Sequence, residues 1–221
     1  QRFSISPVLA RVIRNRDIEG DEAIEKYLHG TIRDLYDPAF LKGSREAVLL
    51  LKDKIKGQMP IRVIGDYDAD GICSSYILTK GLRVFEGRVD TAIPHRIHDG
   101  YGLNENLIEE ACTDGVKLIV TCDNGIAAAP QIALAVEKGI SVVVTDHHEV
   151  PFHMIDGKKE EILPPAEAIV DPKREGCPYP FKSICGGVVA YKLIEACGEL
   201  LVKENVITQE KLQELLTELL Q

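Results

Sequence analysis

The feature of this sequence that most constrains its fold is an apolar run that ends in three carboxylates at alternate positions. Residues 61–65 lead directly into Asp66, Asp68 and Asp70. In an extended chain, alternate residues share a face about 7 Å apart, and carboxylates at that separation raise one another's pKa. The sequence therefore predicts that a cation, and a divalent metal ion in particular, lies at the end of this strand.

Two later apolar runs end in the same way. Residues 117–122 are followed by Asp123, and residues 140–145 by the triplet Asp-His-His at 146–148. Short runs rich in Val and Ile with helix-like segments after them are typical of buried parallel strands. Ligands of open parallel sheets bind beyond the carboxyl ends of the strands. We therefore expect one rim of the sheet to gather these side chains: Asp66, Asp68, Asp70, Asp123, Asp146, His147 and His148.

From residue 61 onward the hydrophobic pattern alternates between strands and helices. Repeated units of this kind predict an α/β fold, with a mostly parallel sheet flanked by helices on both faces. The expected strands cover residues 61–65, 89–93, 117–122, 140–145 and 168–170, and the expected helices cover residues 72–85, 104–113 and 126–138. Residues 151–165 are expected to form a long polar loop.

The residues before this alternation have a polar, helical pattern. Gly20 and Gly30 interrupt the pattern, which predicts short helices instead of strands. We therefore expect a helical N-terminal cap over residues 1–56, followed by the sheet domain over residues 57–221.

Each acidic residue also has an ordinary structural interpretation. A single Asp after a strand is usually a turn residue or a helix N-cap, and a histidine pair is usually a surface feature. The joint pattern favours a metal site, because oxygen ligands with one or two imidazoles suit Mn2+ or Mg2+. No closely spaced cysteine pair in the sequence indicates a structural zinc site.

Three other folds place acidic residues after a strand. A dinucleotide-binding fold needs a glycine-rich turn after its first strand, where Asp66, Asp68 and Asp70 would repel phosphates. A phosphatase with an aspartyl nucleophile and a phosphate-accepting receiver domain both begin with Asp-x-Asp. Neither of these two explains the triplet at 146–148.

Three motifs resemble those of the DHH phosphoesterases. They are GDYDADG at residues 65–71, TCDNG at 121–125 and VTDHHE at 144–149. The DYDADG form is similar to the RecJ-like branch of this family, the single-stranded-DNA-specific exonucleases. The resemblance covers nearly the whole chain, and its other parts are residues 35–38, 93–105 and 168–193.

The resemblance implies roles for the residues of the rim. It implies two Mn2+ or Mg2+ ions as cofactors, held by the ligands Asp68, Asp70, Asp123 and His147. His148 would contact the scissile phosphate as the catalytic histidine, while Asp66 and Asp146 would orient the ligands from behind. The resemblance thus divides the polar side chains into metal ligands, a catalytic group and supporting groups.

Two segments outside the three motifs predict contacts with nucleic acid. His95, Arg96 and Tyr101 combine cations with an aromatic ring, which suits a loop that approaches a phosphate chain and stacks a base. Gly186 and Gly187 precede an apolar helical pattern and would let amides at a helix N-terminus approach a phosphate. A surface loop and plain close packing explain the same residues, and both interpretations stay open.

The implied function is metal-dependent phosphodiester hydrolysis, with single-stranded DNA degraded from its 5′ end in repair or recombination. A single-strand-binding protein or a helicase would be its protein partners. Two alternatives stay open: a DHH phosphodiesterase that acts on short oligonucleotides or cyclic dinucleotides, and a non-catalytic scaffold in replication or repair. A scaffold has no chemical reason to keep the carboxylates together, which favours an enzyme.

Charge and motif content predict that this chain is part of a larger enzyme. A formal net charge of −9 lacks the basic surface of a stand-alone nucleic-acid-binding domain. The family's fourth motif, an Asp in a later apolar segment, does not occur before Gln221, although Asp171 is a candidate to replace it. We therefore expect a weak or inactive enzyme, truncated before that motif. A final apolar stripe is expected to pack on a segment beyond the chain, and it consists of Leu212, Leu215, Leu216, Leu219 and Leu220.

The cysteines and the hydropathy predict the compartment. The six cysteines have no disulfide-framework spacing, which suits a reducing environment. No apolar stretch has the length of a membrane span. A cytoplasmic protein without a membrane contact is therefore expected.

Overall fold

The computed structural model describes residues 3–95 and 101–220. Its contacts divide the chain into two units, Gln1–Asp37 and Pro38–Gln221. The sheet and the predicted rim lie in the larger unit.

The smaller unit is helical and polar. It contains α1 (Pro7–Arg14), α2 (Asp21–His29) and a 3-10 turn at Ile32–Asp34. The hydroxyl of Ser6 accepts the amide of Leu9 and so caps α1. Among the described residues of this unit, Ile13 alone has a buried side chain. Short helices without a substantial core agree with the polar pattern of the sequence.

The larger unit contains a five-stranded sheet in which every strand pairs with its neighbours in parallel. The strand order is β2-β1-β3-β4-β7, with bounds Ile61–Ile64 (β1), Val89–Ala92 (β2), Leu118–Cys122 (β3), Ser141–Thr145 (β4) and Ala168–Val170 (β7). All residues of β1, β3 and β7 are buried. Continuous burial is typical of parallel strands whose two faces are both covered.

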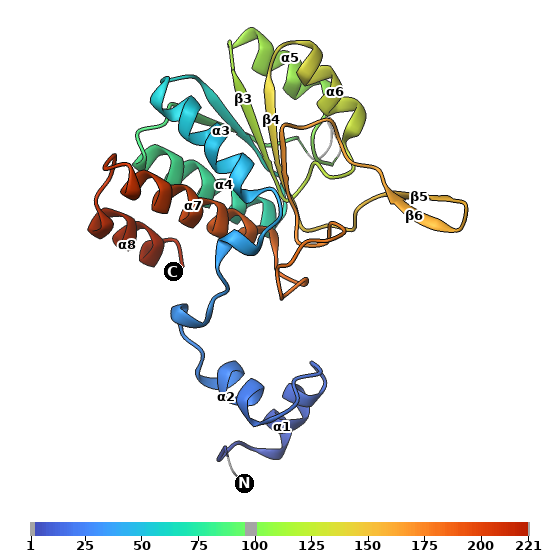
Figure 1. Cartoon of the computed structure of the whole chain (residues 1–221), viewed down its shortest axis with the longest axis vertical. Helices are drawn as coiled ribbons and strands as arrows, with labels where there is room; N and C mark the ends of the chain where they lie inside the picture. Colours follow the sequence, from blue (N-terminus) through green and yellow to red (C-terminus); the bar gives the residue numbers. More distant parts are fainter. Residues whose placement is uncertain (1–2, 96–100, 221) are drawn as a thin grey trace. The chain divides into compact units, whose positions relative to one another are not determined.

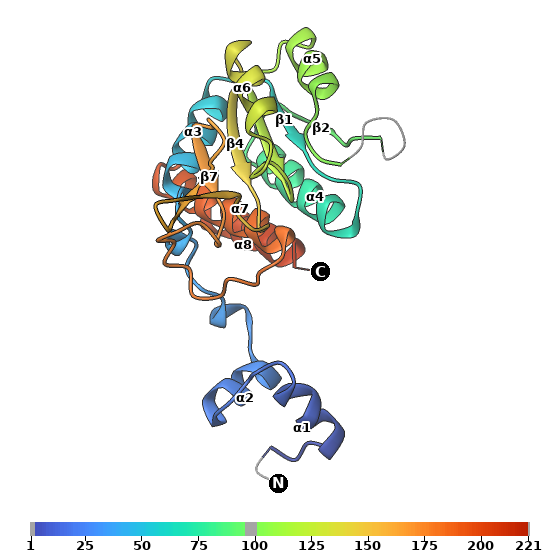
Figure 2. The ribbon, with the colours of Figure 1, turned by 90° about the vertical axis from the view of Figure 1, so that its right-hand side faces the viewer.

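Helices cover both faces of the sheet (Figures 1 and 2). One face carries α3 (Ser44–Lys56), α4 (Ala69–Val84) and α7 (Gly186–Lys203), with α8 (Gln209–Glu218) packed on α7. The other face carries α5 (Glu105–Thr113) and α6 (Ala129–Glu137). Successive residues of β3 point to opposite faces, because Val120 packs in the first core and Ile119 in the second. The predicted α/β fold, with a parallel sheet between two helical layers, is confirmed.

Residues 151–165 contain a β-hairpin, where the sequence predicted a polar loop. β5 (Phe152–Ile155) and β6 (Lys158–Glu161) pair antiparallel, and the hairpin extends away from the sheet (Figure 1). Asp156 and Gly157 join the strands with φ angles of 51° and 77°, the left-handed pair that a tight two-residue hairpin turn requires. The prediction of a loop was wrong because the charged β6 hides the strand pattern, although the Asp-Gly turn signal was present.

The C-terminal apolar stripe packs within the chain, where the sequence predicted a neighbour beyond it. Four leucines in α8 and directly after it are buried in the same core as α7: Leu212, Leu215, Leu216 and Leu219. Gly198 of α7 makes the close approach possible, because an added Cβ would lie 2.2 Å from Leu212 Cδ1. The prediction was wrong because α7 buries residues around much of its circumference and so offers α8 an apolar surface.

Helix α3 belongs to the larger unit, whereas the sequence predicted a boundary after residue 56. Ala47, Leu51 and Ile55 of α3 are buried in the same core as α7. The division at Asp37 and Pro38 therefore falls before this helix.

Two findings bear on the predicted compartment. Each of the six cysteines, all of which lie within the described residues, is free. In residues 3–95 and 101–220, no helix combines the length and the apolar character that crossing a membrane requires.

Candidate metal centre

Four aspartates lie where strands β1, β3, β4 and β7 end at the same rim of the sheet. Asp123, Asp146 and Asp171 each follow a strand directly, and Asp66 follows β1 after one glycine. Their exposed fractions are between 0% and 2%. Because β3 pairs in register with β4, and β4 with β7, the ends of these strands lie side by side. Parallel register alone therefore assembles a buried acidic rim.

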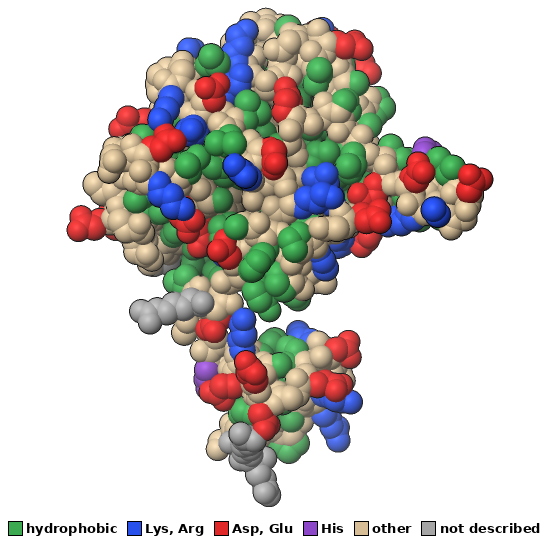
Figure 3. Space-filling model, in the orientation of Figure 1, with side chains coloured by type: hydrophobic (Ala, Val, Ile, Leu, Met, Phe, Trp, Pro, Cys, Tyr) green, Lys and Arg blue, Asp and Glu red, His purple; other side chains and the backbone are tan. Residues whose placement is uncertain are grey.

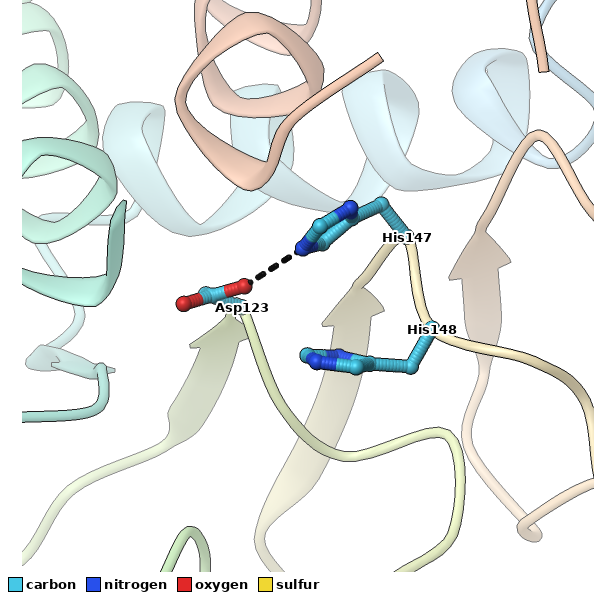
Figure 4. A group of neighbouring side chains, drawn as sticks. All are labelled: Asp123, His147 and His148. Carbon is cyan, nitrogen blue, oxygen red and sulfur yellow. Dashed lines mark hydrogen bonds and ion pairs between the residues drawn. The ribbon is translucent and has the colours of Figure 1, made fainter. Parts of the chain in front are cut away.

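His147 connects the rim to the start of α4. Its ring points toward Asp123 (Figure 4), with Nε2 2.9 Å from Asp123 Oδ1. The same nitrogen lies 3.4 Å from Asp70 Oδ2. Asp123 itself has a φ of 59°, a left-handed conformation that is uncommon outside glycine, so the chain turns sharply directly after β3. Three of the predicted ligands, Asp70, Asp123 and His147, thus converge.

Asp68 and Asp70 lie at the start of α4 and have different partners. Asp68 is the N-cap of the helix, and its Oδ1 accepts the amide of Gly71 at 2.9 Å. Asp70, in the first turn, accepts the Gly186 amide through Oδ2 and the Gly187 amide through Oδ1, both at 2.7 Å. Asp68 therefore caps its own helix, while Asp70 joins α4 to α7.

Asp146 holds the histidine triplet in place. Its Oδ2 accepts the Ile126 amide at 3.0 Å, and its Oδ1 accepts the His147 amide and His148 Nδ1, both at 2.7 Å. Burial acts to raise the pKa of Asp146, but the hydrogen bonds from His148 and the Ile126 amide outweigh it and hold this pKa below its usual value. The hydrogen bond to Asp146 in turn raises the pKa of His148. The pair therefore stabilises the imidazolium form of His148.

Burial and like charge act together on two other carboxylates. Burial raises the pKa of Asp123 to about 7, and Asp70 and Asp68 add to the shift. Asp66 is fully buried, and neither of its carboxylate oxygens makes a well-formed hydrogen bond within the described residues, although the backbone amides of Tyr67 and Gly102 act to lower its pKa. Burial also raises the pKa of Asp66. Both groups are costly as anions, and a nearby cation would remove that cost.

The donor set at the rim fits a hard divalent cation. Ligand atoms of Asp123, His147 and His148 lie within 4.8 Å of one another in the described part of the chain. Carboxylate oxygens with one or two imidazoles suit Mn2+ or Mg2+. The buried carboxylate of Asp66 supports the same conclusion, because its hydrogen-bonding neighbours among the described residues, the Tyr67 and Gly102 amides, do not offset the effect of burial on its pKa, and an ion or water commonly completes such a group.

Tyr101, one of the residues expected to contact nucleic acid, lies at the rim. Its hydroxyl donates to the carbonyl oxygen of Asp123 at 3.2 Å and lies 3.5 Å from His148 Nε2. Its ring meets those of Tyr67 and His148 edge-on, with centroid distances of 6.2 Å and 6.3 Å. Three rings therefore stand next to the acidic cluster, with 55% of Tyr101 exposed.

The other residues expected to contact nucleic acid lie in three different settings. His95 is exposed in the segment after β2. Arg96 lies outside the described residues. The amides of Gly186 and Gly187, which were expected to face a phosphate, donate to Asp70 instead.

Two polar residues of the rim were not singled out from the sequence. Asn124 donates through Nδ2 to the carbonyl oxygens of Ile64 and Cys122, at 3.2 Å and 2.9 Å, and so ties the ends of β1 and β3 together. Ser74 donates through Oγ to the carbonyl oxygen of Asp70 at 2.7 Å. The TCDNG motif held a signal for Asn124, because Asn side chains readily bond to nearby backbone groups. Ser74 lies inside a helix and has no such signal.

The parallel sheet and the Asp–His cluster at its rim define a class: an α/β protein with a candidate centre for a divalent metal. Comparison with known proteins then gives the family. The family model "DHH family, N-terminal domain" matches residues 60–220, and the chain belongs to the DHH family. The resemblance carried by the three sequence motifs is thereby confirmed.

Curated relatives of this chain include two proteins with one name, "Single-stranded-DNA-specific exonuclease RecJ". The chain is 39% identical over 201 residues to the protein from Bacillus subtilis, which corresponds to 90% of this chain and 24% of the relative. It is 36% identical over 205 residues to the protein from Haemophilus influenzae, or 92% of this chain and 33% of the relative. The chain thus spans about a quarter to a third of the length of these relatives.

Solved structures with the same fold include two RecJ proteins. The crystal structure of exonuclease RecJ bound to manganese aligns with a TM-score of 0.62 and 35% identity, over 73% of this chain and 38% of that chain. The structure of RecJ in complex with Mn2+ from Thermus thermophilus aligns with a TM-score of 0.59 and 26% identity, over 96% of this chain and 30% of that chain.

Proposed function

We propose that this chain is the catalytic part of a metal-dependent exonuclease that hydrolyses single-stranded DNA from its 5′ end in repair or recombination. The observation that carries the proposal is the convergence of Asp70, Asp123 and His147 at the carboxyl end of the sheet. The names of the relatives, single-stranded-DNA-specific exonucleases, support the substrate. The manganese in a related RecJ structure supports the cofactor.

The residues at the rim have different roles in this proposal. The residues that would hold two Mn2+ or Mg2+ ions are Asp68, Asp70, Asp123 and His147. When bound, such ions supply a nucleophile from water and stabilise charge on the phosphoryl oxygens. Asp66 adds a buried carboxylate to the rim, and Asp146 fixes the backbone of His147 and the orientation of the His148 ring.

His148 is suited to the phosphate. Its Nδ1 is engaged by Asp146, so Nε2 is the nitrogen that remains for the substrate, and it lies next to the Tyr101 hydroxyl. As an imidazolium, His148 would donate through Nε2 to a phosphate oxygen or protonate the leaving oxygen. The exposed ring of Tyr101 is placed to contact the adjoining nucleotide.

The setting of such an enzyme follows from its chemistry. Single-stranded DNA would be its partner, supplied by a helicase or a single-strand-binding protein, with His95 and Arg96 as further contacts to the phosphate chain. The free state of all six cysteines favours a reducing compartment, and we place the protein in the cytoplasm.

A matched pair of substitutions tests this function in the complete gene product that contains the chain. Asp123→Asn removes the central carboxylate yet keeps a side chain that tolerates a left-handed backbone. We expect it to lower Mn2+-dependent release of nucleotides from 5′-labelled single-stranded DNA by about 100-fold or more. Asp156→Asn, in the exposed hairpin turn, shares the left-handed conformation and should leave the rate unchanged.

Substrate comparison separates the alternatives. Single-stranded DNA should be shortened faster than duplex DNA, and faster than a cyclic dinucleotide. Preference for a cyclic dinucleotide or for very short oligonucleotides would move the protein to another activity of the same fold. An Asp123→Asn rate within a few-fold of an active parent would contradict the assigned centre, and the absence of hydrolysis by the parent itself would favour a scaffold.

A further inference from the structure

Two backbone amides at the N-terminus of α7 bind both carboxylate oxygens of Asp70, one of the proposed metal ligands. The amides of Gly186 and Gly187 donate to the two carboxylate oxygens of Asp70, each at 2.7 Å, across a separation of 116 and 117 residues in the chain. The first amides of a helix have no acceptor within that helix. A carboxylate placed there gains two charge-assisted hydrogen bonds and the favourable end of the helix dipole.

Gly186 lets α7 approach a second acidic residue as well. A Cβ on Gly186 would lie 2.9 Å from Asp123 Oδ1, 3.0 Å from Asp123 Cβ and 3.1 Å from Ser74 Oγ. At those distances the Asp123 or Ser74 side chain would have to move, so the glycine allows α7 to approach Asp123 without displacing it. At Gly187 the nearest atom to an added Cβ is Asp70 Oδ1, at 3.4 Å. The two glycines therefore differ: the first allows the close approach, and the second contributes mainly its amide.

The helix that offers these amides is fixed in position. Along its length α7 packs on α4, and a Cβ on Gly81 of α4 would lie 2.6 Å from Ile194 Cδ1 of α7. Val189, Leu193 and Ile194 of α7 are fully buried in the core. Because the core sets the distance between the two helices, the amides meet Asp70 at a position that is set before any ligand arrives.

We propose that Gly186 and Gly187 are positioning residues, which hold the Asp70 carboxylate against His147 and Asp123 and thereby prepare the centre for its metal. The inference rests on the proposed function, because it takes Asp70 and Asp123 to be metal ligands. The amides also supply a partial positive charge to the acidic rim, where Asp68, Asp70 and Asp123 repel one another. In this proposal the two amides bind the carboxylate of Asp70, a metal ligand, and the substrate phosphate binds to other groups.

Hydrogen exchange of the metal-free protein tests the contact itself. The amides of Gly186 and Gly187 should exchange slowly although they lie at a helix N-terminus, and Asp70→Ala should make them exchange faster. The corresponding amides of α8, at Gln209 and Glu210, are the control, and Asp70→Ala should not affect them. Equal exchange at the starts of α7 and α8 in the parent would overturn the proposal.

Titration with Mn2+ alone tests the consequence for the metal. Gly187→Pro replaces the N–H that donates to Asp70 Oδ1 by the ring Cδ, so the carboxylate must leave this position. Proline itself is compatible with the second residue of a helix, as Pro130 in the first turn of α6 illustrates. We expect its dissociation constant for Mn2+ to rise about 10-fold to 100-fold. Gly187→Ala keeps the amide and should stay within about threefold of the parent. Glu210→Pro, at the matching position of α8, should bind Mn2+ like the parent.

The outcomes are distinguishable. The proposal would be overturned if Gly187→Pro bound Mn2+ like the parent but bound a 5′-phosphorylated oligonucleotide more weakly. That result would mean that the amides bind the substrate phosphate. Absence of Mn2+ binding in the parent would contradict the proposed function, while the exchange experiment would still report on the contact. Thermal unfolding without metal checks that each variant folds, and if Gly187→Pro does not fold, the exchange of Asp70→Ala decides.

Discussion

Asp146 shows how one buried carboxylate can organise several groups of a site. It accepts the backbone amides of Ile126, His147 and His148 and the Nδ1 of His148. These hydrogen bonds fix both the course of the backbone after β4 and the direction of the second imidazole. A substitution at Asp146 would therefore disturb His147 and His148 together, and it cannot report on either histidine alone.

Asp171 is the buried carboxylate whose titration should be visible in stability. Burial raises its pKa to about 7, and one of its oxygens has no hydrogen-bond partner within the described residues. Between about pH 4 and 7 the folded chain therefore binds a proton that the unfolded chain has lost, so this residue makes stability fall as pH rises. Asp171→Asn keeps an acceptor for the Lys173 amide and removes this penalty.

The measurement is the melting temperature in EDTA as a function of pH. Asp171→Asn should melt above the parent at pH 8, and the difference should shrink as the pH falls below about 4, where Asp171 of the parent becomes protonated in the unfolded state as well. Asp156→Asn, which is exposed, serves as the control. A constant difference at all pH values would mean that packing, not titration, distinguishes the variant.

Sequence predicted those parts of the site that follow from strand ends. Asp123 and His147 were placed at one rim because parallel strands end together, and the structure brings them to 2.9 Å. The contact between Asp70 and Gly186 was not predictable, because it depends on the packing of two helices far apart in the chain. The hydroxyl of Tyr101 likewise finds the Asp123 carbonyl only through the folded loop.

At the scale of elements, prediction succeeded where burial is two-sided. Strands β3 and β4 could be predicted from the sequence, because continuous runs of Val and Ile are typical of strands that are covered on both faces. The β5–β6 hairpin could not be predicted in this way. Its strands are largely exposed, so no core imposes a hydrophobic pattern on their side chains. The partner of α8 was also missed, since periodicity shows which face is apolar and not what covers it.

The α7–α8 contact gives a prediction about packing. Gly198→Ala would place a Cβ 2.2 Å from Leu212 Cδ1 and 3.0 Å from Phe85 Cζ. We expect a loss of about 1–3 kcal/mol in the free energy of unfolding, measured with urea. Leu212→Ala alone should also destabilise, but the double variant should lose less than the sum, because the smaller side chain relieves the clash. Strict additivity would show that α8 does not pack on α7 as described.

The whole molecule is acidic, although the proposed substrate is a polyanion. The formal net charge is −9, and on the face of the larger unit in Figure 3 the acidic and basic side chains of the described residues are interspersed without a continuous basic tract. Affinity for nucleic acid normally comes from cations that neutralise phosphates. In this chain, bound metal would be the main positive charge near the substrate.

Binding of single-stranded DNA by the 221-residue chain should therefore depend on metal. In EDTA we expect no measurable binding of a fluorescent oligonucleotide by anisotropy, since like charges repel. Mn2+ should produce weak binding, and Asp123→Asn should abolish that gain. Tight binding in EDTA that weakens steeply with salt would contradict this prediction, because binding of that kind comes from basic side chains that neutralise phosphates without metal.

The hydrogen bonds from Gly186 and Gly187 to Asp70 also set an order of events during protein synthesis. Translation produces Asp70 well over a hundred residues before these amides exist. Until α7 has left the ribosome, the Asp70 carboxylate lacks the two amides that hold it, and contacts of such sequence separation form slowly. The nascent chain therefore cannot complete the proposed centre early, and we expect metal to bind at the end of folding.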